Sequence, residues 1–368
     1  MLVEKGILSL VKSLLCWTQK GMLGMMPGWL CHWLGQRRRR RGRYDRRTLD
    51  CFRLAWKRCR SRRNLLAYLK CRRDFGYPPP GRLGSLLLRE FSCAPASQQR
   101  LLVNWLSEAG RADLIQAMRS SDLRELADRS PAAAAALVAR GEVLSGFADS
   151  LARMHLAQAD WLAAFAVFLR QHKDSICVVG NAGSLDGAGL GGVIDSHQVV
   201  VRFNHYSAGN QAGGAPFDYR RPPQHDIGGN TQVWVRAPNL TPPYPPLGAQ
   251  LGWVLISGPD VRYQLSSWQE IVPLLHRGCR VLTVPLVVWR ALVRELRAPP
   301  SAGLLVLAWI MQILNGPEGL AAAGFQRRPT AERYHYALHG HKPAQRHNWQ
   351  AERALLCRWQ AAGLRFVD

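Results

Sequence analysis

The amino-acid sequence predicts an α/β protein, in which a mostly parallel, Rossmann-type sheet with helices on both faces follows an all-α N-terminal region. Short runs of β-branched and other apolar residues alternate with helical stretches from about residue 172 onward, which is typical of a parallel sheet. The first half of the chain shows helical periodicity instead. We expect strands at 176–179, 199–201, 232–235, 253–256 and 280–286, and helices at 287–296 and 304–314.

Two boundaries divide the chain into three predicted regions. The stretch Tyr77-Pro78-Pro79-Pro80-Gly81 fits no helix or strand interior and closes a basic region, 1–80. Residues 81–171 are expected to form short helices, because apolar residues follow a 3.6-residue period from Leu101 to Leu106 and Ser130-Pro131 is a helix-start signal. Residues 172–368 form the third region, which contains the predicted sheet.

The composition is globular, but the charge is unusual. Hydrophobic residues make up 47% of the 368 residues and charged residues 20%, while the formal net charge is +24. Such a charge favours acidic partners, namely lipid headgroups, anionic glycans, nucleotides or nucleic acid. It does not indicate which reaction the protein performs.

The N-terminal segment combines apolar residues with a run of arginines. Lys5, Lys12 and Lys20 interrupt its apolar stretch, so we expect neither a transmembrane span nor a cleaved signal peptide, and Arg37 to Arg41 follow without a break. A Trp-bearing amphipathic segment before a basic run predicts that residues 1–73 lie on an anionic membrane surface. A basic helix packed on the rest of the protein is the first alternative, and nucleic-acid binding is the second.

A Gly-Asn turn in the middle of the chain is a candidate ligand site. The run 176–179 stops at Gly180-Asn181-Ala182-Gly183-Ser184, where glycine permits close approach of a ligand, although the spacing matches neither the dinucleotide nor the phosphate-loop fingerprint. The next strand run delivers Arg202 and Asn204, expected on one face of an extended chain. A tight connection, a surface arginine and a turn-forming asparagine are the alternatives.

Four segments in order resemble the motifs of the family 29 glycosyltransferases, the sialyltransferases. Residues 177–204, with 226–231 after them, resemble the large sialyl motif, and Pro300-Ser301-Ala302-Gly303-Leu304 with Gly324-Phe325 resembles the small one. Tyr334-His335-Tyr336 resembles the third motif, and His347 with Glu352 fits the terminal HxxxxE motif. The resemblance covers roughly 175–368 and implies a GT-A-like catalytic domain.

The resemblance also implies roles for individual residues. It implies an inverting, metal-independent transfer of sialic acid or a related acidic sugar from a CMP-linked donor to a glycan or glycolipid hydroxyl, with no cofactor and no metal. The donor-binding residues would be Gly180, Asn181, Ser184, Asn204, Ser301 and Gly303, with Arg202 and Glu352 in support.

Two histidines are the candidate catalytic residues. We expect His347 to be the general base, because a neutral imidazole near pH 7 can take a hydroxyl proton. The resemblance implies that His335 donates to the departing phosphate. Glu352, five residues after His347, does not share its helix face, and we expect it to orient the loop and cap a helix start rather than relay charge.

The sequence departs from the family at several positions. Ala182, Ser184 and Ala302 replace more usual residues, and residues 211–225 look inserted. Ile176 stands where the animal members have a disulfide cysteine, one residue before Cys177, which predicts a bacterial-type member in the reducing cytoplasm, peripheral on the inner face of the membrane. A Kdo-type transferase, a catalytically silent nucleotide-sugar-binding protein and a basic nucleic-acid-binding protein remain the alternatives.

Overall fold

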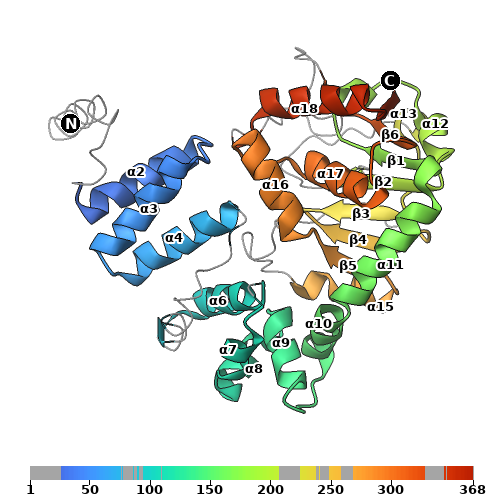
Figure 1. Cartoon of the computed structure of the whole chain (residues 1–368). Coiled ribbons are helices and arrows are strands. Elements are labelled where there is room, and N and C mark those ends of the chain that lie inside the picture. Colours follow the sequence, from blue (N-terminus) through green and yellow to red (C-terminus); the bar gives the residue numbers. More distant parts are fainter. Residues whose placement is uncertain are drawn as a thin grey trace, which may run out of the picture.

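The computed structural model has a seven-stranded sheet at its centre (Figure 1). It describes residues 26–75, 77, 86, 89–90, 94–108, 110–206, 224–237, 240, 248–257, 268–327, 344 and 346–367. The strands are β1 (Ile176–Val179), β2 (Val199–Phe203), β3 (Val233–Arg236), β4 (Trp253–Ile256), β5 (Arg280–Thr283), β6 (Leu320–Ala323) and β7 (Arg365–Val367). Their order is β5-β4-β3-β2-β1-β6-β7, and all six pairings are parallel. The predicted α/β class is therefore confirmed.

The helices of the second half cover both faces of this sheet. They are α11 (Gln158–Gln171), α12 (Gly191–Asp195), α13 (Gln224–Ile227), α15 (Val272–His276), α16 (Leu286–Leu296), α17 (Ala302–Leu314) and α18 (Trp349–Ala361), with 3₁₀ turns η4 (Lys173–Ser175), η5 (Gly183–Leu185) and η6 (Trp268–Glu270). Apolar residues of α11, α16, α17 and α18 pack on one face with Val178 and Val201. Residues of α12, α13, α15 and the preceding helix α10 (Gly146–Leu156) pack on the other, against Cys177, Val200 and Val254.

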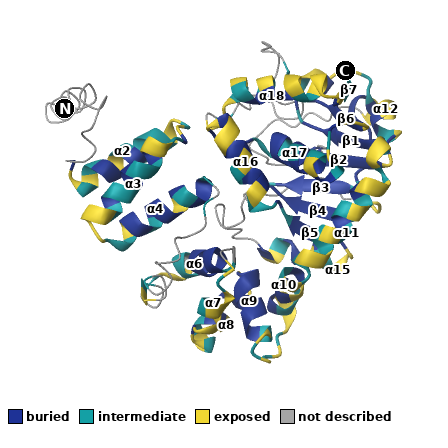
Figure 2. Cartoon of the chain, viewed as in Figure 1, coloured by how far each residue is buried: buried dark blue, intermediate teal, exposed yellow. Residues whose placement is uncertain are grey.

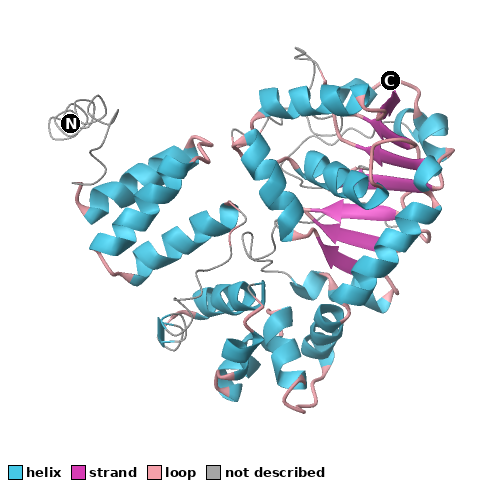
Figure 3. Ribbon diagram, viewed as in Figure 1, coloured by secondary structure: helices cyan, strands magenta, loops and turns pink. Residues whose placement is uncertain are grey.

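The predicted all-α region is also confirmed (Figure 3). Its helices are α2 (Gly28–Arg40), α3 (Arg46–Arg58), α4 (Arg62–Asp74), α6 (Ala96–Glu108), α7 (Ala112–Gln116), α8 (Ser120–Ala127), α9 (Pro131–Val138) and α10 (Gly146–Leu156). Ser130 caps α9 by accepting the Ala133 N–H, with Pro131 at the first helical position, as its sequence predicts. α11 precedes residue 172 but packs on the sheet through Phe165 and Leu169.

Some predicted strands differ from those observed. The run at 280–286 ends at Thr283 and Leu286 already begins α16, because Pro285 interrupts the ladder and precedes the first turn of the helix. β3 lies one residue later than expected. β6 and β7 were not predicted, since Leu320-Ala-Ala-Ala has little β-propensity and becomes a strand only by pairing with β1.

Burial follows the layers of the fold (Figure 2). Strands β1, β2, β3, β4 and β6 are buried at every position, as expected of a parallel sheet with both faces covered. None of the described helices is both long enough and apolar enough to cross a membrane.

The strand order locates the place where a ligand would bind. The chain runs from β1 outward to β5 on one side and then returns to place β6 on the other side of β1. In open parallel sheets, ligands bind beyond the carboxyl ends of the strands where the order reverses. That point is the β1–β6 junction, directly at the Gly180-Asn181 turn.

Candidate functional site at the carboxyl edge of the sheet

The turn after β1 is held closely against the turn after β6. Gly180 N–H donates to Ala323 O at 2.8 Å, and Ala182 N–H donates to Gly324 O at 3.1 Å. A Cβ added at Gly180 would lie 2.4 Å from the Gly324 carbonyl oxygen, so only glycine fits without a backbone shift. Gly324 itself has φ 66°, in the left-handed region. The glycine in this turn is therefore needed for the contact between the two turns.

The side-chain amide of Asn181 forms a hydrogen bond through its nitrogen but not, among the described residues, through its oxygen. Its Nδ2 donates to Phe203 O at 3.0 Å, which orients the side chain across the ends of β1 and β2. Its Oδ1 is buried and has no hydrogen-bond partner within the described part of the chain. Because a buried acceptor without a donor is costly, this oxygen is suited to a ligand N–H or O–H.

Asn204 lies just beyond β2 rather than in it. Its φ of 50° is left-handed, its N–H donates to Val235 O at 2.8 Å, and its Oδ1 accepts the Ala237 N–H at 2.8 Å. The expectation that Arg202 and Asn204 share one strand face is therefore wrong, because β2 ends at Phe203. Asn204 joins the ends of β2 and β3, and Ser184 lies exposed in η5.

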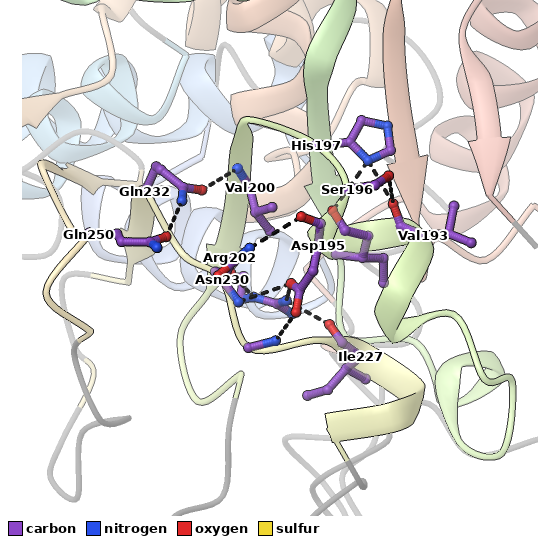
Figure 4. Close-up of polar contacts among 12 residues, drawn as sticks. Val193, Asp195, Ser196, His197, Val200, Arg202, Ile227, Asn230, Gln232 and Gln250 are labelled. Atoms are coloured by element: carbon purple, nitrogen blue, oxygen red, sulfur yellow. Dashed lines mark hydrogen bonds and ion pairs between the residues drawn. The ribbon is translucent and has the colours of Figure 1, made fainter.

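The side chain of Arg202 is fully buried and donates hydrogen bonds to the loop at residues 227–230. Its Nε donates to Asn230 O at 2.8 Å and its Nη2 to Ile227 O at 2.6 Å, while Asp195 Oδ1 lies 3.7 Å from Nη2 (Figure 4). The Asp195 carboxylate also accepts the N–H groups of Gly229 and Asn230, at 2.7 and 3.0 Å. Arg202 and Asp195 thus shape residues 227–230.

Asp226 fastens the loop that follows Ser184. Its two carboxylate oxygens accept the N–H groups of Gly187 and Gly189, each at 2.9 Å. Burial opposes ionisation, but these backbone donors outweigh it and hold the pKa of Asp226 below its ordinary value. Asp195 and Asp226 were not among the predicted site residues, although both lie in the segments that resemble the large motif, 177–204 and 226–231.

The N-terminus of α17 lies at the same edge, because α17 runs antiparallel to the β6 strand that follows it. Ser301 caps this helix by accepting the Leu304 N–H at 3.3 Å. A Cβ added at Gly303 would lie 2.9 Å from Phe325 Cε1. Gly180 and Gly303 therefore approach the adjacent residues Gly324 and Phe325 after β6.

Glu352 binds Ser301 through both of its oxygens. Ser301 N–H donates to Oε1 and Ser301 Oγ donates to Oε2, each at 2.7 Å. The Glu352 side chain is buried, and this burial raises its pKa to about 7 although the two Ser301 donors act in the opposite direction. Glu352 therefore fixes the start of α17 and titrates near neutral pH.

His347 is oriented by the loop before α17. Its Nδ1 lies 2.7 Å from the Pro299 carbonyl oxygen, to which it donates, so Nε2 carries the lone pair and accepts from Arg346 Nε at 3.3 Å. Its ring packs edgewise on Trp349, with centroids 5.2 Å apart. His347 is thus held with its basic nitrogen defined.

The predicted site residues therefore converge only in part. His347, Ser301, Gly303, Glu352, Gly180 and Asn181 belong to connected turns at the carboxyl edge, whereas Arg202 lies below the surface. His335 lies outside the described residues. Within the described part, no group of three His, Cys, Asp or Glu side chains could hold a metal ion.

Residues 155–210 match the family model of glycosyltransferase family 29 (sialyltransferase). This segment therefore resembles glycosyltransferase family 29. It contains α11, β1, the Gly180-Asn181 turn and β2, so the predicted resemblance and the prediction of a glycosyltransferase are confirmed. No curated protein matches the chain.

Solved structures with a similar arrangement include a mammalian sialyltransferase, and the same kind of enzyme in complex with Gal-beta-1-3GalNAc-ortho-nitrophenol. Their sequence identities to this chain are 18% and 16%, respectively. Each comparison covers 52% of this chain and 68% of the other, with a TM-score of 0.36.

Proposed function

We propose that this family 29 glycosyltransferase transfers an acidic sugar, sialic acid or a relative such as Kdo, from a CMP-linked donor to a hydroxyl of a glycan or glycolipid. The observation that carries the proposal is the linkage of three motif segments at one edge of the sheet. The Gly180 turn meets Gly324, Glu352 holds Ser301, and His347 is bound to Pro299. These are the segments that resemble the large, small and terminal motifs.

The donor's nucleotide would bind over the Gly180-Asn181 turn. The unpartnered Asn181 Oδ1 would accept an N–H or O–H of the nucleotide. The start of α17, a helix of 13 residues, would favour the negative charge of the phosphate or of the sugar carboxylate. Ser301 and Gly303 would line this end, and Asn204 would lie across the adjacent strand ends.

The chemical step would use His347 as the general base. In the reaction, Arg346 Nε must first leave His347 Nε2, whose lone pair it occupies in the structure. The acceptor hydroxyl oxygen then attacks the anomeric carbon, its proton passes to His347 Nε2, and the bond from that carbon to the phosphate oxygen breaks to release CMP. Attack opposite the leaving group inverts the anomeric configuration. The Pro299 carbonyl would stabilise the imidazolium that forms, because it accepts the Nδ1–H. His335 is proposed to donate to the departing phosphate, and no step requires a metal.

The decisive test measures CMP release from CMP-sialic acid by the full chain. We expect His347→Ala to abolish release while retaining CMP binding, and His276→Ala, on α15, to leave both unchanged. Asn181→Ala should weaken CMP binding by about tenfold, the loss of one buried hydrogen bond. CMP binding without release would favour the silent nucleotide-sugar-binding protein, and release from CMP-Kdo alone would favour the Kdo-type transferase.

A thermal-shift panel of CMP, CDP, UDP and GDP examines the donor class separately, since a bound nucleotide stabilises the fold by mass action. Stabilisation by CMP but not by the diphosphates supports the proposal. DNA binding with no response to CMP would refute it in favour of a nucleic-acid-binding protein.

We also propose that residues 1–73 associate with an anionic membrane surface, on the inner face of the membrane in the cytoplasm. Residues 1–25 lie outside the described part of the chain. In the described part, two tryptophans of α2, Trp29 and Trp33, are exposed next to the arginine run. Aromatic and basic residues together are typical of surface-bound helices.

A further inference from the structure

An open cavity of about 690 Å³ lies in the helical bundle α2–α4, away from the candidate active site. It is lined by residues of α2, of the turn between α3 and α4, and of the first turn of α4. The residues that decide its chemistry are Trp29, Trp33, Arg37, Arg40, Arg41 and Arg63. None of them has a role in the proposed transfer reaction.

The arginine run splits into two groups with different environments. Arg38 contacts the Asp45 carboxylate and donates to Thr48 Oγ1, and Arg39 lies 3.2 Å from the buried Asp74 carboxylate. These two arginines hold the bundle together. Arg37, Arg40 and Arg41, spaced three and four residues apart, instead line the cavity with Trp29 and Trp33, as residues on one helix face do.

The cavity arginines have no counter-charge of their own. Arg37, Arg40, Arg41 and Arg63 form no ion pair with any residue that the structure describes, in contrast to Arg38 and Arg39. Four cations around one hollow raise the local potential and favour an anion inside it. Guanidinium groups also bind phosphate oxygens in pairs, which an ammonium does not.

Two exposed tryptophans contribute apolar surface to the cavity lining. Trp29 is 70% exposed and Trp33 is 41% exposed, and the Arg37 guanidinium lies over the Trp33 ring at 5.3 Å from its centroid. Tryptophan with an exposed ring beside arginines is favoured at the boundary between lipid and water. A free phosphate would use the arginines alone, whereas a lipid would use both the arginines and the rings.

We propose that this cavity binds the phosphate headgroup of an anionic lipid, with Trp29 and Trp33 in the interfacial layer. The inference rests on the proposed association of residues 1–73 with a membrane surface and adds a defined headgroup site to it. It does not depend on the proposed reaction.

The bundle is fastened next to the candidate active site. Trp289 Nε1, on α16, donates to the Asp74 carbonyl oxygen at 2.9 Å, and the Arg290 guanidinium lies 4.6 Å from the centroid of the Tyr77 ring. α16 leads into the Pro299–Ser301 segment that binds His347 and Glu352. Figure 1 shows the bundle beside α16. A lipid held in the cavity would therefore place the membrane near the edge where the acceptor must enter.

The test is sedimentation of the full chain with vesicles of phosphatidylcholine, with and without phosphatidylglycerol. The double variant Arg37→Gln/Arg40→Gln removes two charges from the cavity. The matched control Arg46→Gln/Arg47→Gln removes two from α3, outside the cavity, where the Arg46 side chain is 95% exposed. We expect the cavity variant to lose on the order of thirtyfold in partitioning to anionic vesicles, and the control to lose clearly less.

The remaining outcomes separate the possible explanations. Equal loss in both double variants would overturn the headgroup site while leaving surface association standing, and no binding of the wild-type chain to anionic vesicles would overturn both. Trp29→Ser/Trp33→Ser should weaken vesicle binding as well. Binding of inorganic phosphate without binding of anionic vesicles, or tighter binding to DNA than to vesicles with the same loss in the cavity variant, would refute a lipid site. CMP-induced stabilisation should be unchanged in every variant, so failure here is separable from failure of the proposed reaction.

Discussion

The ionisation of Glu352 should make the free energy of unfolding depend on pH, and the substitution Glu352→Gln should remove this dependence. Its carboxyl is 4% exposed and accepts two hydrogen bonds from Ser301, yet burial raises its pKa from 4.5 to about 7. The folded chain therefore holds this proton more tightly than the unfolded chain. The stabilisation that results is complete below pH 4.5 and is lost as the pH rises through 7.

The size of the effect follows from the pKa. A rise of about 2.5 pH units corresponds to about 3 kcal/mol at about 1.4 kcal/mol per unit. The side chain introduced by Glu352→Gln is neutral at every pH, so the variant lacks this pH-dependent contribution to stability. Because the amide cannot accept hydrogen bonds from both Ser301 donors, the variant should be about 1 kcal/mol less stable than wild type at low pH. Relative to wild type, the variant should therefore gain about 3 kcal/mol between pH 4.5 and pH 8.

Denaturant unfolding followed by tryptophan fluorescence at several pH values measures this difference. Glu295→Gln is the matched control, because Glu295 is a 45% exposed carboxylate paired with Arg358 on the surface. It should show no such gain. If the free energies of wild type and Glu352→Gln differ by the same amount at pH 4.5 and pH 8, the assigned pKa is wrong.

Further predictions concern the same edge of the sheet. Gly180→Ala should destabilise the fold by about 1–3 kcal/mol and lower its melting temperature, because the new Cβ would lie 2.4 Å from Gly324 O. Gly192→Ala is the control and should not lower the melting temperature, because the space around Gly192 is open. Equal melting temperatures for the two variants would contradict the close contact at Gly180. Ser301→Ala should cost about 1–2 kcal/mol in unfolding experiments, through loss of the α17 cap and of the hydroxyl that binds Glu352. The same substitution should move the midpoint of the pH dependence upward, because it removes a donor that favours the carboxylate, and an unchanged midpoint would argue against that role.

Much of the fold was predictable because its signals are local. β1 and β4 have the predicted bounds, and the Ser130-Pro131 start of α9 is where the sequence places it. β6 was not predictable, because three successive alanines become a strand only when β1 lies beside them. The expected shared face of Arg202 and Asn204 failed for a related reason: where β2 ends depends on its pairing with β3, not on its own residues.

The candidate site shows the same division. The sequence identified Asn181, Ser301, His347 and Glu352 one at a time, through motif spacing. Only the folded chain shows that Glu352 binds Ser301 and that His347 donates to Pro299, contacts that span 51 and 48 residues. Asp226 lies in a segment that resembles the large motif, but its role could not be predicted, because it depends on two glycine N–H groups 37 and 39 residues earlier.

The sequence by itself determined the class of the fold, the basic helical N-terminus and the Gly180-Asn181 turn, because periodicity, charge and glycine act through neighbouring residues. Tertiary structure decided the strand order that places this turn at the β1–β6 junction. It also decided which arginines of the run Arg37–Arg41 bind carboxylates and which line a cavity. These properties depend on contacts between residues far apart in the chain, and such contacts exist only after the helices and strands have packed.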